Sequence, residues 1–238
     1  MILNTLINFM NNLIIQFFVS VENYEQPKYN HIGVNEELYK YSKLSVEKYA
    51  KKIGCDYKLI TESKINYIHP TFERMDLFFN DDWWTNYDNI LYLDTDVIVW
   101  PNSPNIFSEY PNTTTFKPAE DRIAKMKSVK FHIERAKDTC LQEFHPKVLQ
   151  DSRFNAGVFM LNKESAQTMR GHLDFKNLQG DDNEMLIYAM LKSGVNVEKL
   201  DWRYNKKNGT KCYFGHAMGQ QKFNDKYDML ELAKATFN

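Results

Sequence analysis

Short apolar segments alternate with helical patterns along most of this 238-residue chain. The apolar segments are rich in β-branched and aromatic residues and have the length of strands. We predict strands at 13–21, 56–60, 89–93, 96–99, 113–116, 156–161, 197–200 and 211–214. The helical patterns between them cover 35–53, 71–82, 163–172 and 181–193. Alternation of this kind predicts an α/β fold with a mostly parallel central sheet flanked by helices, in which ligands bind at the carboxyl ends of strands.

One domain covering 1–238 is the simplest interpretation, because no repeat or linker divides the chain. The apolar residues before position 13 are interrupted by asparagines and follow no Lys or Arg. We therefore expect 1–12 to be a short leader rather than a signal peptide or an integral membrane segment. Segment 117–150 has mixed charge and weak periodicity. It is either a lid or a pair of surface helices, and the second is the more common case.

Composition and charge narrow the class of protein. The 43% hydrophobic and 14% aromatic content is that of a globular protein. Thirty basic residues balance thirty-one acidic ones without a long basic run, which disfavours nucleic acid as the main partner. Cys55, Cys140 and Cys212 lie far apart and form no CxxC pair, so we expect a soluble protein of a reducing compartment such as the cytoplasm. A homodimer is neither predicted nor excluded by these features.

Two aspartates interrupt an apolar run in the stretch NILYLDTDVIVW, residues 89–100. An isolated buried carboxylate is costly, but residues i and i+2 of a strand point to one face, so Asp94 and Asp96 can aim at one ligand. Their mutual repulsion is relieved when a cation lies between them. Mg²⁺ or Mn²⁺ is usually held by one or two carboxylates together with substrate oxygens. The alternative is a surface turn between two strands, where Asp is common.

Two further motifs carry groups that suit a bound ligand. The spacing H-x-x-G-x-x-K places an imidazole at His216, a small residue at Gly219 and a point charge at Lys222, which suit a metal and a phosphate. A lone His is more often a structural residue. In FNAGVFMLN (154–162), Asn155 precedes a small Ala-Gly pair, which indicates either room for a ligand or a tight turn into a strand.

Two shorter segments complete the set. Asp181 and Asp182 precede a helical pattern, so we expect one of them to cap the helix and the other to be left over. In SVENY (20–24), after the first predicted strand, Tyr24 can stack on a base, and Ser20 or Glu22 can accept hydrogen bonds from that base.

With these five motifs in this order, the sequence resembles the GT-A glycosyltransferases, and most closely glycosyltransferase family eight, the group of glycogenin and of bacterial lipopolysaccharide galactosyltransferases. The resemblance runs from about residue 13 to 222. Its most specific parts are YDNILYLDTDVIV, FNAGVFMLN and the closing H-x-x-G-x-x-K. It implies a single GT-A, Rossmann-like domain, in which 117–150 would be a lid or an excursion on the acceptor side.

The resemblance also implies roles for the residues that match the family's motifs. Asp94, Asp96 and His216 would hold Mn²⁺ or Mg²⁺. The residues that would contact the donor nucleotide and its sugar are Ser20, Val21, Tyr24, Arg74, Asp94, Thr95, Asn155, Asp182, His216, Gly219 and Lys222. The catalytic residues would be Arg74, Asp182, Asn183 and Lys222. In GDDNEML the alignment allows Asp181 and Asp182 to exchange roles. The family often has Pro-Trp after the closing lysine, where this chain has Phe223 and Asn224.

The implied function is metal-dependent transfer of a hexose from a nucleoside diphosphate sugar, most simply a uridine-linked one, to a hydroxyl of a glycan or another acceptor, with retention at the anomeric carbon. Two other functions stay open. A nucleotidyltransferase also uses metal-binding aspartates on an α/β sheet, but the first strand is followed by no Gly-rich phosphate loop. The other is a sugar-nucleotide-binding protein without turnover. The presence of all four motif residues, Asp94, Asp96, His216 and Lys222, argues against a loss of activity.

Overall fold

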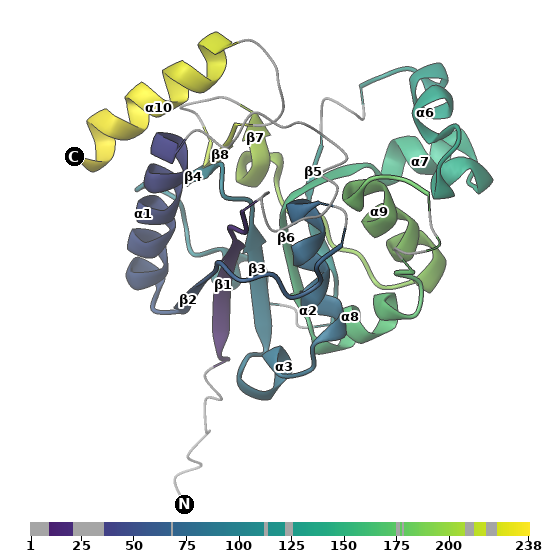
Figure 1. Ribbon diagram of the computed structural model, residues 1–238, viewed down its shortest axis with the longest axis horizontal. Helices are drawn as coiled ribbons and strands as arrows, with labels where there is room; N and C mark the ends of the chain where they lie inside the picture. Colours follow the sequence, from purple (N-terminus) through teal and green to yellow (C-terminus); the bar gives the residue numbers. More distant parts are fainter. Residues whose placement is uncertain are drawn as a thin grey trace, which may run out of the picture.

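The structure is a computed structural model that describes residues 10–20, 36–67, 69–111, 114–121, 126–174, 177, 179–207, 212–217 and 223–238. Its central sheet has five strands in the order β2-β1-β3-β6-β5 (Figure 1). These strands are β1 (Asn12–Phe17), β2 (Asp56–Ile60), β3 (Asn89–Leu93), β5 (Lys117–Glu120) and β6 (Phe154–Asn162). A smaller sheet in the order β4-β8-β7 consists of β4 (Val97–Val99), β7 (Lys206–Lys207) and β8 (Phe214–His216).

The central sheet is mostly parallel, as the sequence predicts. β1 pairs in parallel with β2 and β3, whereas β6 is antiparallel to both β3 and β5. β6 therefore runs against the other four strands. The α/β class with helices flanking a mostly parallel sheet is confirmed.

Helices cover both faces of this sheet (Figure 1). The α-helices are α1 (Glu36–Ile53), α2 (Asp76–Phe79), α3 (Trp83–Asn86), α4 (Ile106–Glu109), α6 (Val129–Ala136), α7 (Pro146–Ser152), α8 (Lys163–Arg170), α9 (Asp182–Ser193) and α10 (Phe223–Phe237). The 3₁₀ helices in the described part of the chain are η2 (Pro70–Met75), η3 (Cys140–Glu143) and η4 (Trp202–Asn205). Among the described residues, no helix has the length and apolar character needed to cross a membrane.

Alternation along the strands divides the core into two layers. Leu13 of β1 and Ile90 of β3 belong to the cluster that contains residues of α2, α8 and α9. Ile14 and Leu91, one position further along, belong to the cluster that contains residues of α1 and of the smaller sheet. Both faces of β1 and β3 are thus buried, which explains why these two strands are mostly apolar.

The helix α1 shows why the local sequence forms these elements. Glu36 and Glu37 lie in its first turn and Lys51 and Lys52 in its last, which complements the helix dipole. Gly54 follows with a φ of +71°, a conformation that favours glycine and ends the helix. The predicted helix over 35–53 agrees with this element to one residue.

Several predicted boundaries are shifted or wrong. The strand expected at 113–116 is β5 at Lys117–Glu120, and the strand expected at 211–214 is β8 at Phe214–His216. Residues 197–200 form isolated bridges with Phe116 and Ala119 rather than a strand. The helix expected over 71–82 consists of η2 followed directly by α2, and it ends at Phe79 because Asn80 adopts an extended conformation. Pairing with distant segments, rather than local hydrophobicity, sets these boundaries.

Segment 117–150 contains β5, α6, η3 and the first residues of α7. Helices α6 and α7 lie together beyond α9, at one side of the molecule (Figure 1). The segment therefore contains the surface helices that the sequence allowed, and a role as a lid or on the acceptor side stays a prediction.

Candidate active site

Asp94 and Asp96 lie where the chain leaves the central sheet at the carboxyl end of β3 and turns into β4. The Asp94 N–H donates to the Gly157 carbonyl at 2.8 Å, and the Asp94 carbonyl accepts from the Val97 N–H at 3.1 Å. Gln16 of β1 also donates to this carbonyl at 3.0 Å. The two carboxylates thus belong to a turn, but a turn fixed against β1 and β6, and their side chains are only 23% and 24% exposed.

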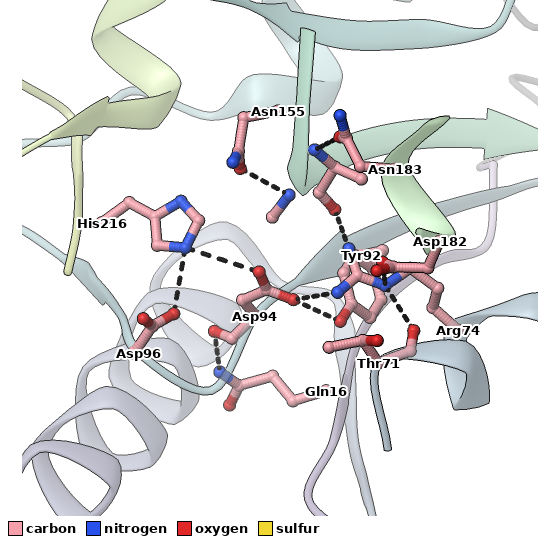
Figure 2. A network of polar contacts seen from close by, with 12 residues as sticks. Gln16, Thr71, Arg74, Tyr92, Asp94, Asp96, Asn155, Asp182, Asn183 and His216 are labelled. Atoms are coloured by element: carbon pink, nitrogen blue, oxygen red, sulfur yellow. Dashed lines mark hydrogen bonds and ion pairs between the residues drawn. The ribbon is translucent and has the colours of Figure 1, made fainter. Parts of the chain in front are cut away.

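His216, at the end of β8, meets both carboxylates (Figure 2). Its Nε2 lies 3.0 Å from Asp96 Oδ1 and 3.4 Å from Asp94 Oδ2. β8 is antiparallel to β4 and pairs His216 with Val97, which places the imidazole beside the turn. The smaller sheet therefore brings together residues that are 120 positions or more apart in the sequence.

Arg74 lies behind this cluster, in η2, and is 4% exposed. Its Nη2 lies 2.9 Å from Asp94 Oδ1, its Nη1 donates to the Ala156 carbonyl at 2.6 Å, and its Nε lies 3.3 Å from Asp182 Oδ2. The guanidinium also lies 4.7 Å from the centre of the Tyr92 ring. Arg74 is thus engaged by protein groups and orients two carboxylates, and its expected contact with donor phosphates stays a prediction.

The two oxygens of Asp94 have different partners. Oδ1 accepts from Arg74 and, at 2.5 Å, from the Tyr92 hydroxyl. Oδ2 is the oxygen that faces His216. Because one oxygen is held by the protein, the other is presented in a fixed position toward Asp96 and His216 (Figure 2).

Asp181 and Asp182 separate into the two roles that the sequence leaves open. Asp181 caps α9, accepting from the Glu184 N–H at 2.8 Å. Asp182, in the first turn, faces Arg74 with a side chain that is 13% exposed. The expectation that one aspartate caps the helix is confirmed, and Asp182 is the one that faces the site.

Asn155 and Asn183 approach the site from β6 and α9 (Figure 2). The Asn155 Oδ1 accepts from the Gly157 N–H at 2.9 Å, and the Asn183 Oδ1 accepts from the Ala156 N–H at 2.7 Å. The carbonyl oxygens of both side chains are therefore used by the backbone of β6, which leaves their NH₂ groups for other contacts.

Gly157 shows what the Ala-Gly pair accommodates. A Cβ atom at this position would lie 2.0 Å from His216 Cε1 and 2.7 Å from Asp94 Oδ2. The sequence analysis explains the small residue by room for a ligand or by a tight turn. At Gly157 the side chains of His216 and Asp94 occupy this space.

The remaining expected residues are less well placed by the structure. Thr95 lies in the turn between the two carboxylates, and Ser20 follows β1 and is exposed. Val21, Tyr24, Gly219 and Lys222 lie outside the described residues. Their expected roles stay predictions.

Burial and neighbouring charges shift three pKa values in the site. Burial would raise the pKa of Asp94, but the Arg74 charge and the His216 hydrogen bond outweigh it and lower that pKa to about 2. Burial would lower the pKa of His216, but Asp96 and Asp94 raise it to about 9. Burial, together with the charges of Asp181 and Asp94, raises the pKa of Asp182 to about 6 despite Arg74.

The donor set fits a divalent cation. One ligand atom from each of Asp94, Asp96 and His216 lies within 4.8 Å of the other two. Two carboxylates and an imidazole nitrogen are all acceptors when the imidazole is neutral, so a proton or a cation must lie among them. Mn²⁺ accepts such mixed oxygen and nitrogen ligands, and Mg²⁺ accepts the carboxylates.

Two residues that shape the site have no distinctive sequence motif. Gln16 lies within an apolar strand, and Asn205 lies outside every motif, although its Oδ1 is 2.7 Å from His216 Nδ1. Each acts on a residue far away in the chain, so local patterns contain no signal for it.

Neither a protein-family model nor a curated protein sequence matches the chain. Solved structures do match its fold. A glycosyltransferase involved in glycosylation of the major capsid of PBCV-1 matches with a TM-score of 0.56 and 13% identity, over 93% of this chain and 99% of the other.

Two further structures agree. The bifunctional glycosyltransferase WbbM matches with a TM-score of 0.54 and 13% identity, over 94% of this chain and 50% of the other. The glycosyltransferase GlyE of Streptococcus pneumoniae matches with a TM-score of 0.52 and 14% identity, over 94% of this chain and 60% of the other. The chain therefore has the GT-A fold of these glycosyltransferases.

Proposed function

We propose that the protein is a metal-dependent glycosyltransferase that moves a hexose from a nucleoside diphosphate sugar, most simply a UDP-sugar, to an acceptor hydroxyl. The observation that carries this proposal is the convergence of Asp94, Asp96 and His216 at the carboxyl end of β3. In open α/β sheets this edge is where ligands bind. The family-eight motifs of the sequence and the GT-A fold support the same function.

Asp94, Asp96 and His216 would hold the cation, Mn²⁺ or Mg²⁺. When bound, this cation neutralises charge that develops on the diphosphate leaving group. Gly219 and Lys222 would contact the same diphosphate, as the family resemblance implies. The anionic leaving group would then be stabilised by positive charge, a form of catalysis that is usually the largest single contribution.

Retention at the anomeric carbon requires either a covalent intermediate on the protein or attack from the side of the leaving group. Asn183 is unsuited as a nucleophile, because it is an amide and its oxygen already accepts from the Ala156 N–H at 2.7 Å. We favour front-side attack. The acceptor oxygen bonds to the anomeric carbon as the bond to the diphosphate breaks, and the acceptor proton passes to a phosphate oxygen.

Asp182 would stabilise the positive charge that develops on the sugar. Arg74 holds its carboxylate in place, with Nε 3.3 Å from Oδ2, and the Asp182 side chain keeps a 13% exposed surface. The NH₂ groups of Asn155 and Asn183 would donate to sugar hydroxyls. These three residues are the ones that a variant series should test for an effect on the donor sugar.

The test is a donor panel. UDP-glucose, UDP-galactose, UDP-N-acetylglucosamine and GDP-mannose are incubated with the protein and Mn²⁺, and release of the nucleoside diphosphate is measured with and without EDTA. We expect release from one donor, and its loss with EDTA or in Asp96→Ala. Asp228→Ala, at an exposed position of α10, is the control and should keep the activity.

The same assay separates the other functions. Binding of UDP to the wild type without release from any donor would indicate a binding protein without turnover. Formation of pyrophosphate from a nucleoside triphosphate and a sugar 1-phosphate would indicate a nucleotidyltransferase. Titration calorimetry adds a direct test of the metal site, because unchanged UDP affinity of Asp96→Ala in Mn²⁺ would contradict it.

A further inference from the structure

We infer that Asn205 is a positioning residue for the metal ligand His216, one that fixes the imidazole so that Nε2 is the nitrogen offered to the cation. This inference rests on the proposed metal site. Asn205 ends η4 and is 6% exposed, and it lies outside every motif that the sequence analysis singles out. Its Oδ1 lies 2.7 Å from the Nδ1 of His216.

The orientation of the Asn205 amide is determined by its other contacts. Its Nδ2 donates to the Asn155 carbonyl at 3.1 Å and lies 3.4 Å from Asn155 Oδ1. Both partners are acceptors, so the NH₂ group must face Asn155 and the oxygen must face His216. Because this oxygen can only accept, the Nδ1 of His216 carries a proton in every state that keeps the contact.

A proton fixed on Nδ1 leaves Nε2 as the nitrogen with a lone pair whenever the imidazole is neutral. Nε2 is the nitrogen that faces Asp96 and Asp94, at 3.0 and 3.4 Å. A hydrogen bond to the far nitrogen also raises the basicity of a ligating imidazole and prevents the ring from turning. Asn205 thus acts on the cation through His216 and does not itself reach it.

Asn205 is held rigidly enough for this role. The residue before it, Tyr204, is 0% exposed, and its hydroxyl donates to Glu109 at 2.6 Å. The residues after it form β7, which pairs in parallel with β8 and places Lys207 beside His216. The backbone on both sides of Asn205 is therefore fixed against the element that carries the imidazole.

The experiment compares Mn²⁺ affinity, measured from the electron paramagnetic resonance signal of free Mn²⁺ without any nucleotide, in wild type and variants. Asn205→Leu keeps the approximate volume but removes the acceptor, and we expect Mn²⁺ binding to weaken about 10–100-fold. Asn205→Asp restores an acceptor for Nδ1 but turns its second oxygen toward the two acceptors of Asn155, so its affinity should lie between those of wild type and Asn205→Leu.

Asn89→Leu is the matched control. It removes a buried amide at the amino end of β3, where Nδ2 donates to Asn12 Oδ1 at 3.0 Å, far along the strand from the site. Its Mn²⁺ affinity should equal that of wild type even if its melting temperature falls. Should Asn205→Leu not fold, Asn205→Ala replaces it with the same expectation.

Three results would contradict the inference. Equal Mn²⁺ affinity of Asn205→Leu and wild type, where wild type binds and Asp96→Ala does not, would overturn it while leaving the metal site intact. Absence of Mn²⁺ binding in wild type would overturn the metal site and the inference together. Loss of affinity in Asn205→Asp as large as in Asn205→Leu would also count against it, because the acceptor alone would then not explain the effect.

Discussion

At the scale of single residues, two ligands of the candidate metal site, Asp94 and His216, are each oriented by groups outside the ligand set. Asp94 is held through Oδ1 by Arg74 and Tyr92, and His216 is held through Nδ1 by Asn205. Preorganisation of this kind lowers the cost of binding, because the ligand atoms need not be ordered by the cation. It also makes the site sensitive to changes that touch none of the ligand atoms directly.

Gly157 provides the sharpest case. In Gly157→Ala the new methyl group would lie 2.0 Å from His216 Cε1, so the imidazole must move away from the carboxylates. We expect the free energy of unfolding to fall by about 1–3 kcal/mol, as in other overpacked cores, together with a loss of Mn²⁺ binding. Urea unfolding and Mn²⁺ titration measure the two effects.

The control for this change is Gly171→Ala at the end of α8. A Cβ there has nothing within 4 Å, and its φ is −63°, which any residue adopts. It should leave both stability and Mn²⁺ affinity close to wild type. Normal Mn²⁺ binding by Gly157→Ala would contradict the placement of His216.

Asp182 predicts a pH dependence of stability in the metal-free protein. Its pKa in the folded state, about 6, lies above its ordinary value of 3.8. The folded protein therefore binds this proton more tightly than the unfolded chain does. The resulting contribution to the free energy of unfolding is fully present below about pH 4 and is lost as the pH rises through about 6. The side chain of Asp182→Asn does not titrate in this range. The free energy of unfolding of this variant, relative to wild type, should therefore increase as the pH rises from 4 to 7.

Parallel urea titrations of both proteins at several pH values provide the measurement. A constant difference between them across this range would show that the pKa of Asp182 is not raised. Asp228→Asn, at an exposed position of α10, is the comparison for general effects of removing one carboxylate.

At the scale of elements, η2 is tied to the segment after β2 by one buried carboxylate. Glu73, which is 0% exposed, accepts from the Ser63 hydroxyl at 2.7 Å and from the backbone N–H groups of 64, 65 and 66 at 2.6, 3.0 and 3.1 Å. The next residue is Arg74. The carboxylate of Glu73 thus fixes the element that holds Asp94 and Asp182.

Glu73→Gln should therefore affect both stability and activity. The amide has one acceptor oxygen instead of two and turns its NH₂ group toward N–H donors. We expect the free energy of unfolding to fall by about 1.5–3 kcal/mol, the range for hydrogen bonds to charged groups, with a loss of donor-dependent activity. Glu62→Gln, whose side chain is 84% exposed, is the control and should remain within about 0.5 kcal/mol of wild type. Equal stability of the two variants would contradict this account of η2.

At the scale of the whole molecule, the site joins two sheets. Asp94 directly follows β3 of the central sheet, whereas His216 ends β8 of the smaller one, and the turn between β3 and β4 connects the two sheets. A cation held by residues of both sheets would bind the folded chain and not the unfolded one. Binding should consequently stabilise the whole fold rather than one loop.

Mn²⁺ at about 100 times its dissociation constant should raise the free energy of unfolding by about 2.7 kcal/mol. Thermal or urea unfolding with increasing Mn²⁺ measures this, with Asp96→Ala as the variant that should not respond. A response of equal size in Asp96→Ala would indicate Mn²⁺ binding elsewhere on the protein.

Local sequence determined much of this protein. Strands β2 and β3 begin and end where the sequence pattern predicts, and α1 agrees to one residue. β3 is buried along its whole length, and such burial requires a nearly continuous apolar run. Asp94 and Asp96 could be assigned to the carboxyl end of a strand for the same reason. An aspartate pair before a helix likewise predicted the cap of α9.

Only the tertiary structure decided what depends on pairs of residues far apart in the chain. The bounds of β5 and β8 follow from their pairing with β6 and β4, and the choice of Asp182 over Asp181 follows from the position of Arg74. Gly157 and Asn205 matter because of where His216 lies. Both residues act through contacts with a side chain that is distant in the sequence. Hydrophobic periodicity and capping patterns act within a few residues and therefore do not encode such contacts.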